Sequence, residues 1–226
     1  MSDNKINYQT GDILLYHGRK GNSIIDSIKY YIQYLIEWFT GSEWCHVAMI
    51  LKDPIYIDTS LKGLYIIESG YEDSVDAEDH KHKLGVQIYP LDEALEQYVG
   101  DIYYRKLTFL PHNKVSLQSP FGSLSTDDRD DIFSPKKMKE IHSVIHDKPY
   151  DLHLLDWFEA YEQVDFSPQK TSRFWCSALV SYIYTKVGLF NANTDWSIAL
   201  PKEFGSNKIN KLLKNAQLSE KLIKVN

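Results

Sequence analysis

Hydrophobic positions along the chain recur at two spacings, one typical of strands and one typical of helices. Short apolar runs bounded by turn residues predict strands over 11–16, 44–51, 55–59, 64–69, 86–89 and 101–108. Apolar residues at helical spacing predict helices over 23–39, 91–98, 134–147, 154–163 and 176–187. The pattern therefore places most of the strands before most of the helices.

Two segments lack this periodicity. The segment near 111–133 is rich in Ser, Pro, Gly and Asp, which predicts a surface insertion. The segment 207–226 carries five lysines and one glutamate, which predicts a basic, solvated C-terminal tail. Because we find no internal repeat and no domain boundary, residues 1–226 are interpreted as a single domain.

Charge and composition narrow the classes of function. The chain has 25 Lys and Arg against 31 Asp and Glu, a net charge of -6, which argues against a nucleic-acid partner. The first ten residues are polar and do not resemble a secretory signal, and charged residues interrupt the apolar stretch 24–39. We therefore expect a cytoplasmic protein with no transmembrane segment. The sequence does not exclude a location in a virion or elsewhere in a host cell, and it does not exclude peripheral contact with a membrane.

The two cysteines are the first candidates for chemistry. Cys45 lies in a predicted strand beside His46, and neighbours in a strand point to opposite faces, so Cys45 is interpreted as a small buried residue. Cys176 begins a predicted helix, where free backbone N–H groups and the helix dipole stabilise a thiolate or an oxyanion. Ser177 beside it is small enough to let a substrate approach. An inert buried cysteine fits this helix equally well.

A thiolate nucleophile also needs a base and a group that orients the base. Of the eight histidines, His46 is the one embedded in an apolar strand. Glu68, at the end of a nearby predicted strand, could hold the imidazole of His46, and Asp58 competes for that role. Spacing alone leaves both acids open.

Four segments in a fixed order resemble a known superfamily. They are Gly11–Leu14, Trp44–Ile50, Ile67–Gly70 and Phe174–Val180. Together, over roughly 11–205, they are similar to the circularly permuted NlpC/P60 (papain-like) superfamily, in its YiiX-like and lecithin:retinol acyltransferase-like group. The resemblance implies an α+β, papain-like NlpC/P60 fold, circularly permuted so that His precedes Cys. In that fold a small antiparallel sheet packs against helices that include the Cys-bearing helix.

Carried over to this chain, the resemblance implies Cys176 as nucleophile, His46 as general base and Glu68 as the orienting residue. Tyr150 follows a proline and resembles the tyrosine that the family places near the oxyanion site. Trp175 departs from the Asp that precedes the nucleophile in many non-permuted members. A bulky aromatic residue there could narrow the site or favour an apolar substrate.

The resulting hypothesis is a cysteine hydrolase or acyltransferase that cleaves an amide or ester through an acyl-enzyme on Cys176. The expected substrate is a small molecule, a lipid acyl group or a peptide. Tyr30, Tyr34 and Trp38 form an aromatic stripe on the 23–39 helix, which either faces an acyl chain or belongs to the core. One alternative is a non-catalytic lipid- or peptide-binding module with the same fold. Another is a virion-type structural protein in which these residues do not catalyse a reaction.

The sequence carries no cofactor signature, and we expect no cofactor and no metal. His142 and His146 are four residues apart on a predicted helix, a spacing that can bind a metal. Ser143 follows His142 where the HExxH motif has Glu, so both histidines are interpreted as residues at the boundary of the core. His80 and His82 lie in a charged loop and are interpreted as solvated.

Overall fold

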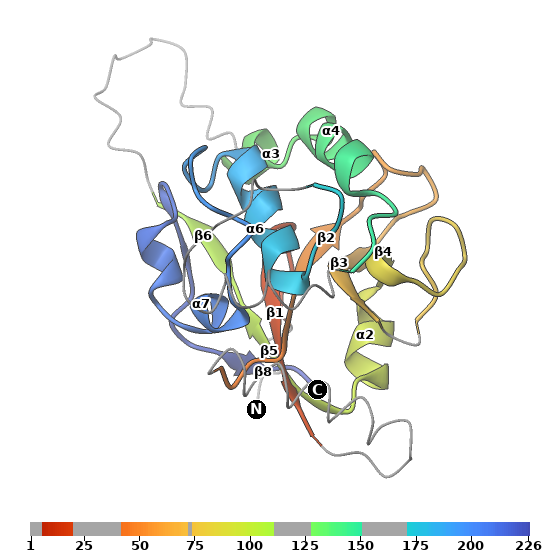
Figure 1. Ribbon diagram of the computed structural model, residues 1–226, viewed down its shortest axis with the longest axis horizontal. Helices are drawn as coiled ribbons and strands as arrows, with labels where there is room; N and C mark the ends of the chain where they lie inside the picture. Colours follow the sequence, from red (N-terminus) through yellow and green to blue (C-terminus); the bar gives the residue numbers. More distant parts are fainter. Residues whose placement is uncertain (1–5, 20–41, 72–73, 111–127, 151–170) are drawn as a thin grey trace.

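An antiparallel sheet of six strands, in the order β4-β3-β2-β1-β5-β8, forms the centre of the fold (Figure 1). The computed structural model describes residues 6–19, 42–71, 74–110, 128–150 and 171–226. The strands of this sheet are β1 (Ile13–Gly18), β2 (His46–Lys52), β3 (Leu64–Tyr71), β4 (Leu84–Pro90), β5 (Gly100–Arg105) and β8 (Ile223–Lys224). A second sheet pairs β6 (Leu107–Phe109) with β7 (Ala216–Leu218).

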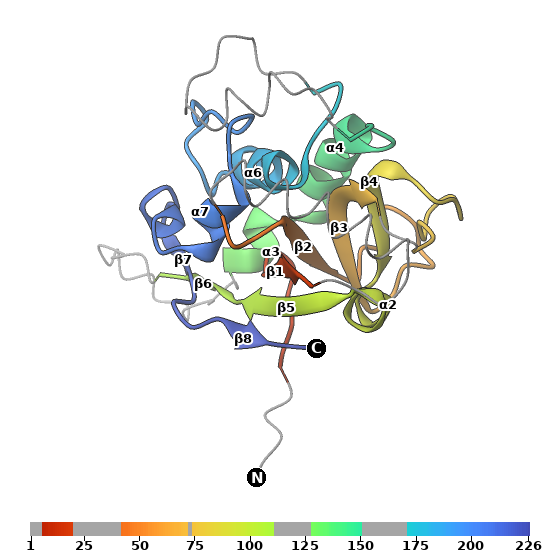
Figure 2. The ribbon, with the colours of Figure 1, turned by 60° about the horizontal axis from the view of Figure 1, so that its bottom comes forward.

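Helices lie on both faces of the six-stranded sheet. They are α2 (Leu91–Gln97), α3 (Asp128–Ile132), α4 (Pro135–Ile145), α6 (Cys176–Val187), α7 (Pro201–Gly205) and the 3-10 helix η1 (Ile209–Lys211). Helix α6 packs on β2 and β3, with α4 beside it, and α2 packs on β3 and β4. Figure 2 shows α6 and α4 on one side of the sheet and α2 on the other. The described part of the chain is thus α+β, with an antiparallel sheet between helices.

The central strand β2 is buried on both faces. Val47, Met49 and Leu51 belong to the larger apolar cluster, which contains α6, whereas Ala48 and Ile50 belong to the cluster that contains α2. The alternation of side chains along a strand accounts for this division. A strand buried on both faces holds its first residue, His46, in a fixed place at the end of the sheet.

Three of the predicted helices are confirmed, namely α2, α4 and α6. Of these, α6 begins at Cys176 and ends at Gly188, whose φ of 92° is the left-handed cap expected of a glycine there. The predicted helices over 23–39 and 154–163, and with them Tyr30, Tyr34 and Trp38, lie outside the described residues. Among the described residues, no helix is both long and apolar enough to span a membrane.

One local prediction is wrong, and another is tested only at its end. The predicted strand over 55–59 consists of turns, in which Ile57 donates to the carbonyl oxygen of Pro54 and Leu61 to that of Asp58. Asp53 has a positive φ of 48°, and Pro54 lacks a backbone donor, so the β-branched and aromatic residues that follow do not pair as a strand. The predicted insertion near 111–133 lies outside the described residues as far as 127, and its residues 128–132 form α3.

The predicted solvated tail, 207–226, is also wrong, because this segment is part of the fold. It contributes η1, β7 and β8, and it buries Ile209, Ala216 and Leu218. The side chain of Arg105, only 1% exposed, donates to the carbonyl oxygens of Phe204, Ser206, Leu218 and Ser219 and to the side chain of Asn207. A buried guanidinium on β5 therefore holds the C-terminal segment in place.

Candidate active site

Cys176 stands at the first position of α6. Leu179, Val180 and Ile183 on the same helix are fully buried, so packing fixes the helix against the sheet. Trp175 is extended, with φ of -90° and ψ of 171°, and makes no side-chain cap to the helix. The N–H groups of the first turn are thus not satisfied by a cap, and they and the helix dipole favour negative charge beside Cys176.

His46, the first residue of β2, faces both an acid and the cysteine. Its Nε2 lies 2.7 Å from Oε2 of Glu68 on β3. The side chain of Cys176 lies close enough to the His46 ring to influence its pKa. Because Nε2 is engaged by Glu68, Nδ1 is the ring nitrogen left for Cys176. Three residues from three separate elements therefore meet at one imidazole.

The surroundings of His46 favour the charged imidazolium. Burial alone would lower the pKa of His46, but the Glu68 carboxylate and the Cys176 sulfur together raise that pKa well above the ordinary value of about 6.5. The ring is largely buried, with a side chain 12% exposed, so water screens these charges little. In general, a positive charge beside a cysteine favours its thiolate form.

Glu68 is itself held from the other side. Its carboxylate is fully buried, and Oε1 accepts a hydrogen bond of 2.8 Å from Nε2 of Gln87 on β4. Glu68 and Gln87 are direct partners in the β3–β4 register, so their side chains leave the same face of the sheet. The other amide atom of Gln87, Oε1, is buried without a partner among the described residues. Sequence reasoning missed Gln87, because only the strand register brings it to Glu68.

Ser69 and Gly70, the next two residues of β3, position the other parts of the site. Ser69 is fully buried and donates a 2.7 Å hydrogen bond to the carbonyl oxygen of Phe174, two residues before Cys176. A Cβ on Gly70 would lie 3.1 Å from Cε1 of His46 and 3.3 Å from Oε1 of Glu68. Because Gly70 has no side chain, it leaves the space that the imidazole of His46 occupies. The sequence reading included both residues in a motif without giving either a role.

The two acids that the sequence left open lie in different surroundings. Asp58 is exposed and lies in a turn, where its carboxylate accepts a 2.8 Å hydrogen bond from the backbone N–H of Ser60. That hydrogen bond lowers the pKa of Asp58. The carboxylate that contacts His46 is that of Glu68.

Trp175 and Ser177, on either side of the cysteine, share one acceptor. The indole N–H of Trp175 and the hydroxyl of Ser177 donate to the carbonyl oxygen of Ala199, at 3.2 and 2.7 Å. These bonds tie the start of α6 to the residues before α7. The predicted part of Trp175 and Ser177 in substrate or oxyanion binding stays a prediction, and the polar side-chain atoms of both already have this structural partner.

Tyr150 lies beside the segment that leads into α6. It forms an isolated parallel bridge with Phe174, and Phe174 donates to the carbonyl oxygen of Pro149 at 3.1 Å. The backbone N–H of Tyr150 donates to Leu84 of β4 at 3.2 Å. Tyr150 is therefore near the start of α6, as expected, and its role at an oxyanion stays a prediction.

Cys45 is a packed residue, as the sequence indicates. It is 2% exposed and belongs to the apolar cluster that contains α2. Its sulfur contacts the carbonyl oxygen of Tyr16 at 3.2 Å and the hydroxyl of Tyr98 at 3.3 Å. The two cysteines, both buried, thus have different surroundings, because the sulfur of Cys45 contacts two oxygens and that of Cys176 acts on the His46 ring.

Comparison with known proteins adds one relative and no function. No family model matches the chain. An uncharacterized protein of Acanthamoeba polyphaga mimivirus is 32% identical to it over 153 residues, which are 66% of this chain and 52% of the relative. The chain thus spans about half the length of the curated relative that it matches.

Proposed function

We propose that the protein is a cysteine-dependent hydrolase or acyltransferase that cleaves an amide or ester bond through an acyl-enzyme on Cys176. The observation that carries the proposal is the contact of His46 with both Glu68 and Cys176. The three residues come from β2, β3 and the start of α6. A nucleophile, a base and a group that orients the base are the parts that acyl transfer through a thiolate requires.

The chemistry follows from this arrangement. The Cys176 thiolate adds to the carbonyl carbon, and a sulfur–carbon bond forms as the carbonyl oxygen takes the negative charge. N–H groups at the start of α6 stabilise that oxyanion. When the bond from carbon to the leaving nitrogen or oxygen breaks, the His46 imidazolium gives its proton to the leaving atom. Water or an acceptor alcohol or amine then attacks the thioester, loses its proton to His46 and releases Cys176.

Glu68 acts on His46 rather than on the substrate. Its carboxylate holds the ring through Nε2 and compensates the positive charge that forms during the reaction. Gln87 holds the carboxylate in turn, while Ser69 keeps the backbone before Cys176 against β3. These residues are positioning residues, because they fix the distance between the base and the sulfur.

The same arrangement supports membership of the circularly permuted NlpC/P60 superfamily, which we propose as the family of this chain. His46 and Glu68 on adjacent strands precede Cys176 on a helix, which is the permuted order. The antiparallel sheet with α6 packed on β2 and β3 is compatible with a papain-like core. Together with the four sequence segments, these features support the assignment.

Trapping of the acyl-enzyme tests the proposal. The protein is incubated with activated esters of short and long acyl chains and with peptide amides, and its intact mass is followed. We expect one acyl adduct per chain on Cys176, in the Cys45→Ala control as well as in the wild type, and none in Cys176→Ala. The preferred ester or amide then separates a lipid acyl substrate from a peptide. Binding of these compounds without any adduct or turnover would instead support a non-catalytic binding module.

A further inference from the structure

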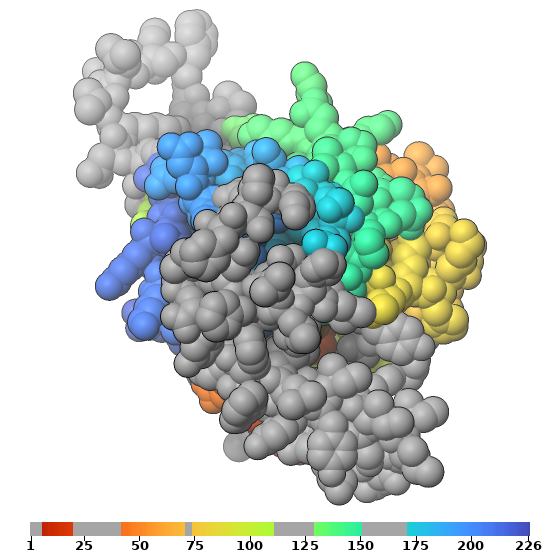
Figure 3. All heavy atoms as spheres, in the orientation of Figure 1, coloured from red at the N-terminus to blue at the C-terminus, as the bar shows by residue number. Residues whose placement is uncertain are grey.

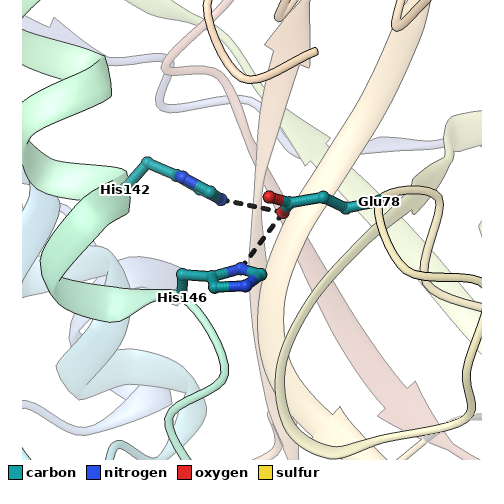
Figure 4. Close-up of side chains that lie close together, drawn as sticks. All are labelled: Glu78, His142 and His146. Carbon is teal, nitrogen blue, oxygen red and sulfur yellow. Dashed lines mark hydrogen bonds and ion pairs between the residues drawn. The ribbon is translucent and has the colours of Figure 1, made fainter.

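A second cluster of polar side chains lies apart from Cys176, where α4 ends beside the loop between β3 and β4. Nε2 of His142 lies 2.9 Å from Oε2 of Glu78, and Nδ1 of His146 lies 3.2 Å from the same oxygen (Figure 4). The ligand atoms of Glu78, His142 and His146 all lie within 4.8 Å of one another. Two imidazoles thus converge on one carboxylate.

Helix α4 presents the two histidines together. Met138, Ile141 and Ile145 bury one stripe of the helix, and His142 and His146 lie one turn apart beside that stripe. His146 is the C-cap of α4, and its backbone N–H donates to the carbonyl oxygen of His142. The packing of α4 therefore fixes the backbone positions from which both imidazoles reach Glu78.

The backbone that carries Glu78 is held by a buried aspartate. Asp76 is 1% exposed, and its Oδ1 accepts hydrogen bonds from the N–H of Glu78 at 2.8 Å and of Asp79 at 3.2 Å. Its Oδ2 accepts from the N–H of Ile88 on β4 at 2.9 Å. The turn that presents Glu78 is thus fastened to the sheet, so the carboxylate has a defined position opposite α4.

The outer nitrogen of His146 also has a carboxylate partner. Its Nε2 lies 3.2 Å from Oδ2 of Asp147, while its Nδ1 is directed at Glu78. An imidazole that donates from Nε2 to a carboxylate presents the lone pair of Nδ1 on the opposite side, which is the form in which histidine binds metals. A carboxylate behind a ligating histidine is the usual outer support of such sites.

The spacing of the three atoms fits a metal ion. In a tetrahedral site with bonds of about 2.0–2.1 Å, neighbouring ligand atoms are about 3.3 Å apart. The separations of 2.9 and 3.2 Å between Glu78 and the two histidines are close to that value. The cluster is also open to solvent, since the side chains of His142, Glu78 and His146 are 14%, 22% and 36% exposed. Figure 3 shows the region of α4 next to the loop before β4 on the surface of the molecule.

We propose that Glu78, His142 and His146 form a binding site for a divalent transition metal, with zinc as the best match to two imidazoles and one carboxylate. Three protein ligands leave a fourth position for water, and Asp147 supports His146 from outside. The surrounding charge suits a cation. Carboxylates of Asp76, Asp79 and Asp147 lie nearby, and Lys83 is the cation that pairs with all three.

The bound metal would fasten α4 to the loop before β4. Lys148 and Pro149 follow directly and pair with this edge of the sheet, where Val86 donates to the carbonyl oxygen of Lys148 at 2.8 Å. The metal would therefore reinforce a connection between α4 and β4 that otherwise rests on hydrogen bonds and the Lys83–Asp147 ion pair. The expected consequence is a zinc-dependent increase in thermal stability.

Zinc titration tests the site. The full chain, freed of metal with a chelator, is titrated with Zn²⁺ at pH 7.5 against a chromophoric chelator. The Cys176→Ala variant serves as the background, so that the thiol of the candidate active site cannot supply a ligand. We expect one zinc per chain, a weakening of binding by about 10–100-fold in Asp147→Asn, and a larger weakening in His142→Ala, which loses a ligand. His82→Ala, an exposed histidine of the same loop, is the matched control and should bind as the background does.

Thermal unfolding distinguishes loss of the metal site from loss of the fold. Without metal, the background, His142→Ala and His82→Ala should melt at similar temperatures. Added zinc should raise the melting temperature of the background and of His82→Ala but not that of His142→Ala. The absence of saturable binding, or equal zinc binding by His142→Ala and His82→Ala, would overturn the proposal. Neither result bears on catalysis by Cys176.

Discussion

Replacement of Glu68 by Gln should lower the pKa of His46. The change keeps the shape of a fully buried side chain and removes its charge, 2.7 Å from Nε2 of His46. Gln87 can adapt, because its Oε1 is buried without a partner among the described residues and a flip of the amide would present that acceptor to the new NH₂ group. The expected effect is therefore loss of the charge rather than loss of packing.

The magnitude follows from the kind of bond that is lost. A hydrogen bond to a charged group contributes about 1.5–3 kcal/mol, and one pKa unit corresponds to about 1.4 kcal/mol. The pKa of His46, which is well above its ordinary value in the wild type, should thus fall in Glu68→Gln, because the imidazolium loses stabilisation of that size. NMR titration of the imidazole, identified by its absence from the spectrum of His46→Ala, measures the change directly.

Asp58→Asn is the matched control, because Asp58 is the exposed acid that lies outside the site. It should leave the titration of His46 unchanged. An unchanged pKa in Glu68→Gln, or a wild-type His46 that titrates at or below about 6.5, would refute the reasoning.

The same shift predicts how stability depends on pH. Because the folded protein raises the pKa of His46, the resulting stabilisation is fully present below the unfolded value of about 6.5 and is lost as the pH rises through the folded-state pKa. The difference in free energy of unfolding between the wild type and Glu68→Gln should therefore be larger at pH 6 than at pH 9. Urea denaturation at the two pH values measures it, and a difference that grows with pH would contradict the sign.

Three further predictions concern other residues. His46→Ala should lower the rate of acyl-enzyme formation by about 10²–10⁴-fold with a far smaller effect on the melting temperature, and an unchanged rate would remove His46 from the mechanism. Gly70→Ala should lower the same rate, because its Cβ would lie 3.1 Å from Cε1 of His46, and an NMR signal of His46 that stays in place would argue against this contact. Arg105→Met should destabilise the fold by about 3 kcal/mol or more in urea denaturation, because it leaves buried carbonyl oxygens without donors. Arg19→Met, which removes an exposed guanidinium from Asp101 but leaves Asp101 paired with Lys224, is the control and should cost less than about 1 kcal/mol.

Local sequence signals predicted the elements that carry the candidate site. The apolar spacing after Cys176 and the glycine at 188 give both ends of α6, because a helix end depends on a few neighbouring residues. The strands that begin at His46 and contain Glu68 were likewise predicted from apolar runs. Cys45 is separate from this site for another reason than the predicted alternation, because it precedes β2 and packs in the same apolar cluster as Ala48 and Ile50.

Contacts between residues far apart in the sequence could not be predicted in the same way. Gln87 reaches Glu68 only through the register of β3 and β4, and Glu78 reaches His142 across 64 positions of sequence. The C-terminal segment was misjudged because its lysines outnumber its acids, although Ile209 and Leu218 pack inside and Arg105 satisfies its carbonyl groups. The number of charged residues in such a segment indicates how polar its surface is. Whether the segment packs against the fold depends instead on the burial of a few apolar residues.

Alkylation of Cys176 with and without His46 tests the central claim most directly. The wild-type protein and His46→Ala are treated briefly with iodoacetamide at neutral pH, and the modification of each cysteine is quantified by peptide mass spectrometry. The account predicts that Cys176 reacts faster than buried Cys45 in the wild type and loses this advantage in His46→Ala, because the imidazole activates the thiol. Labelling of Cys176 that is as slow as that of Cys45, or that is unchanged in His46→Ala, would contradict it.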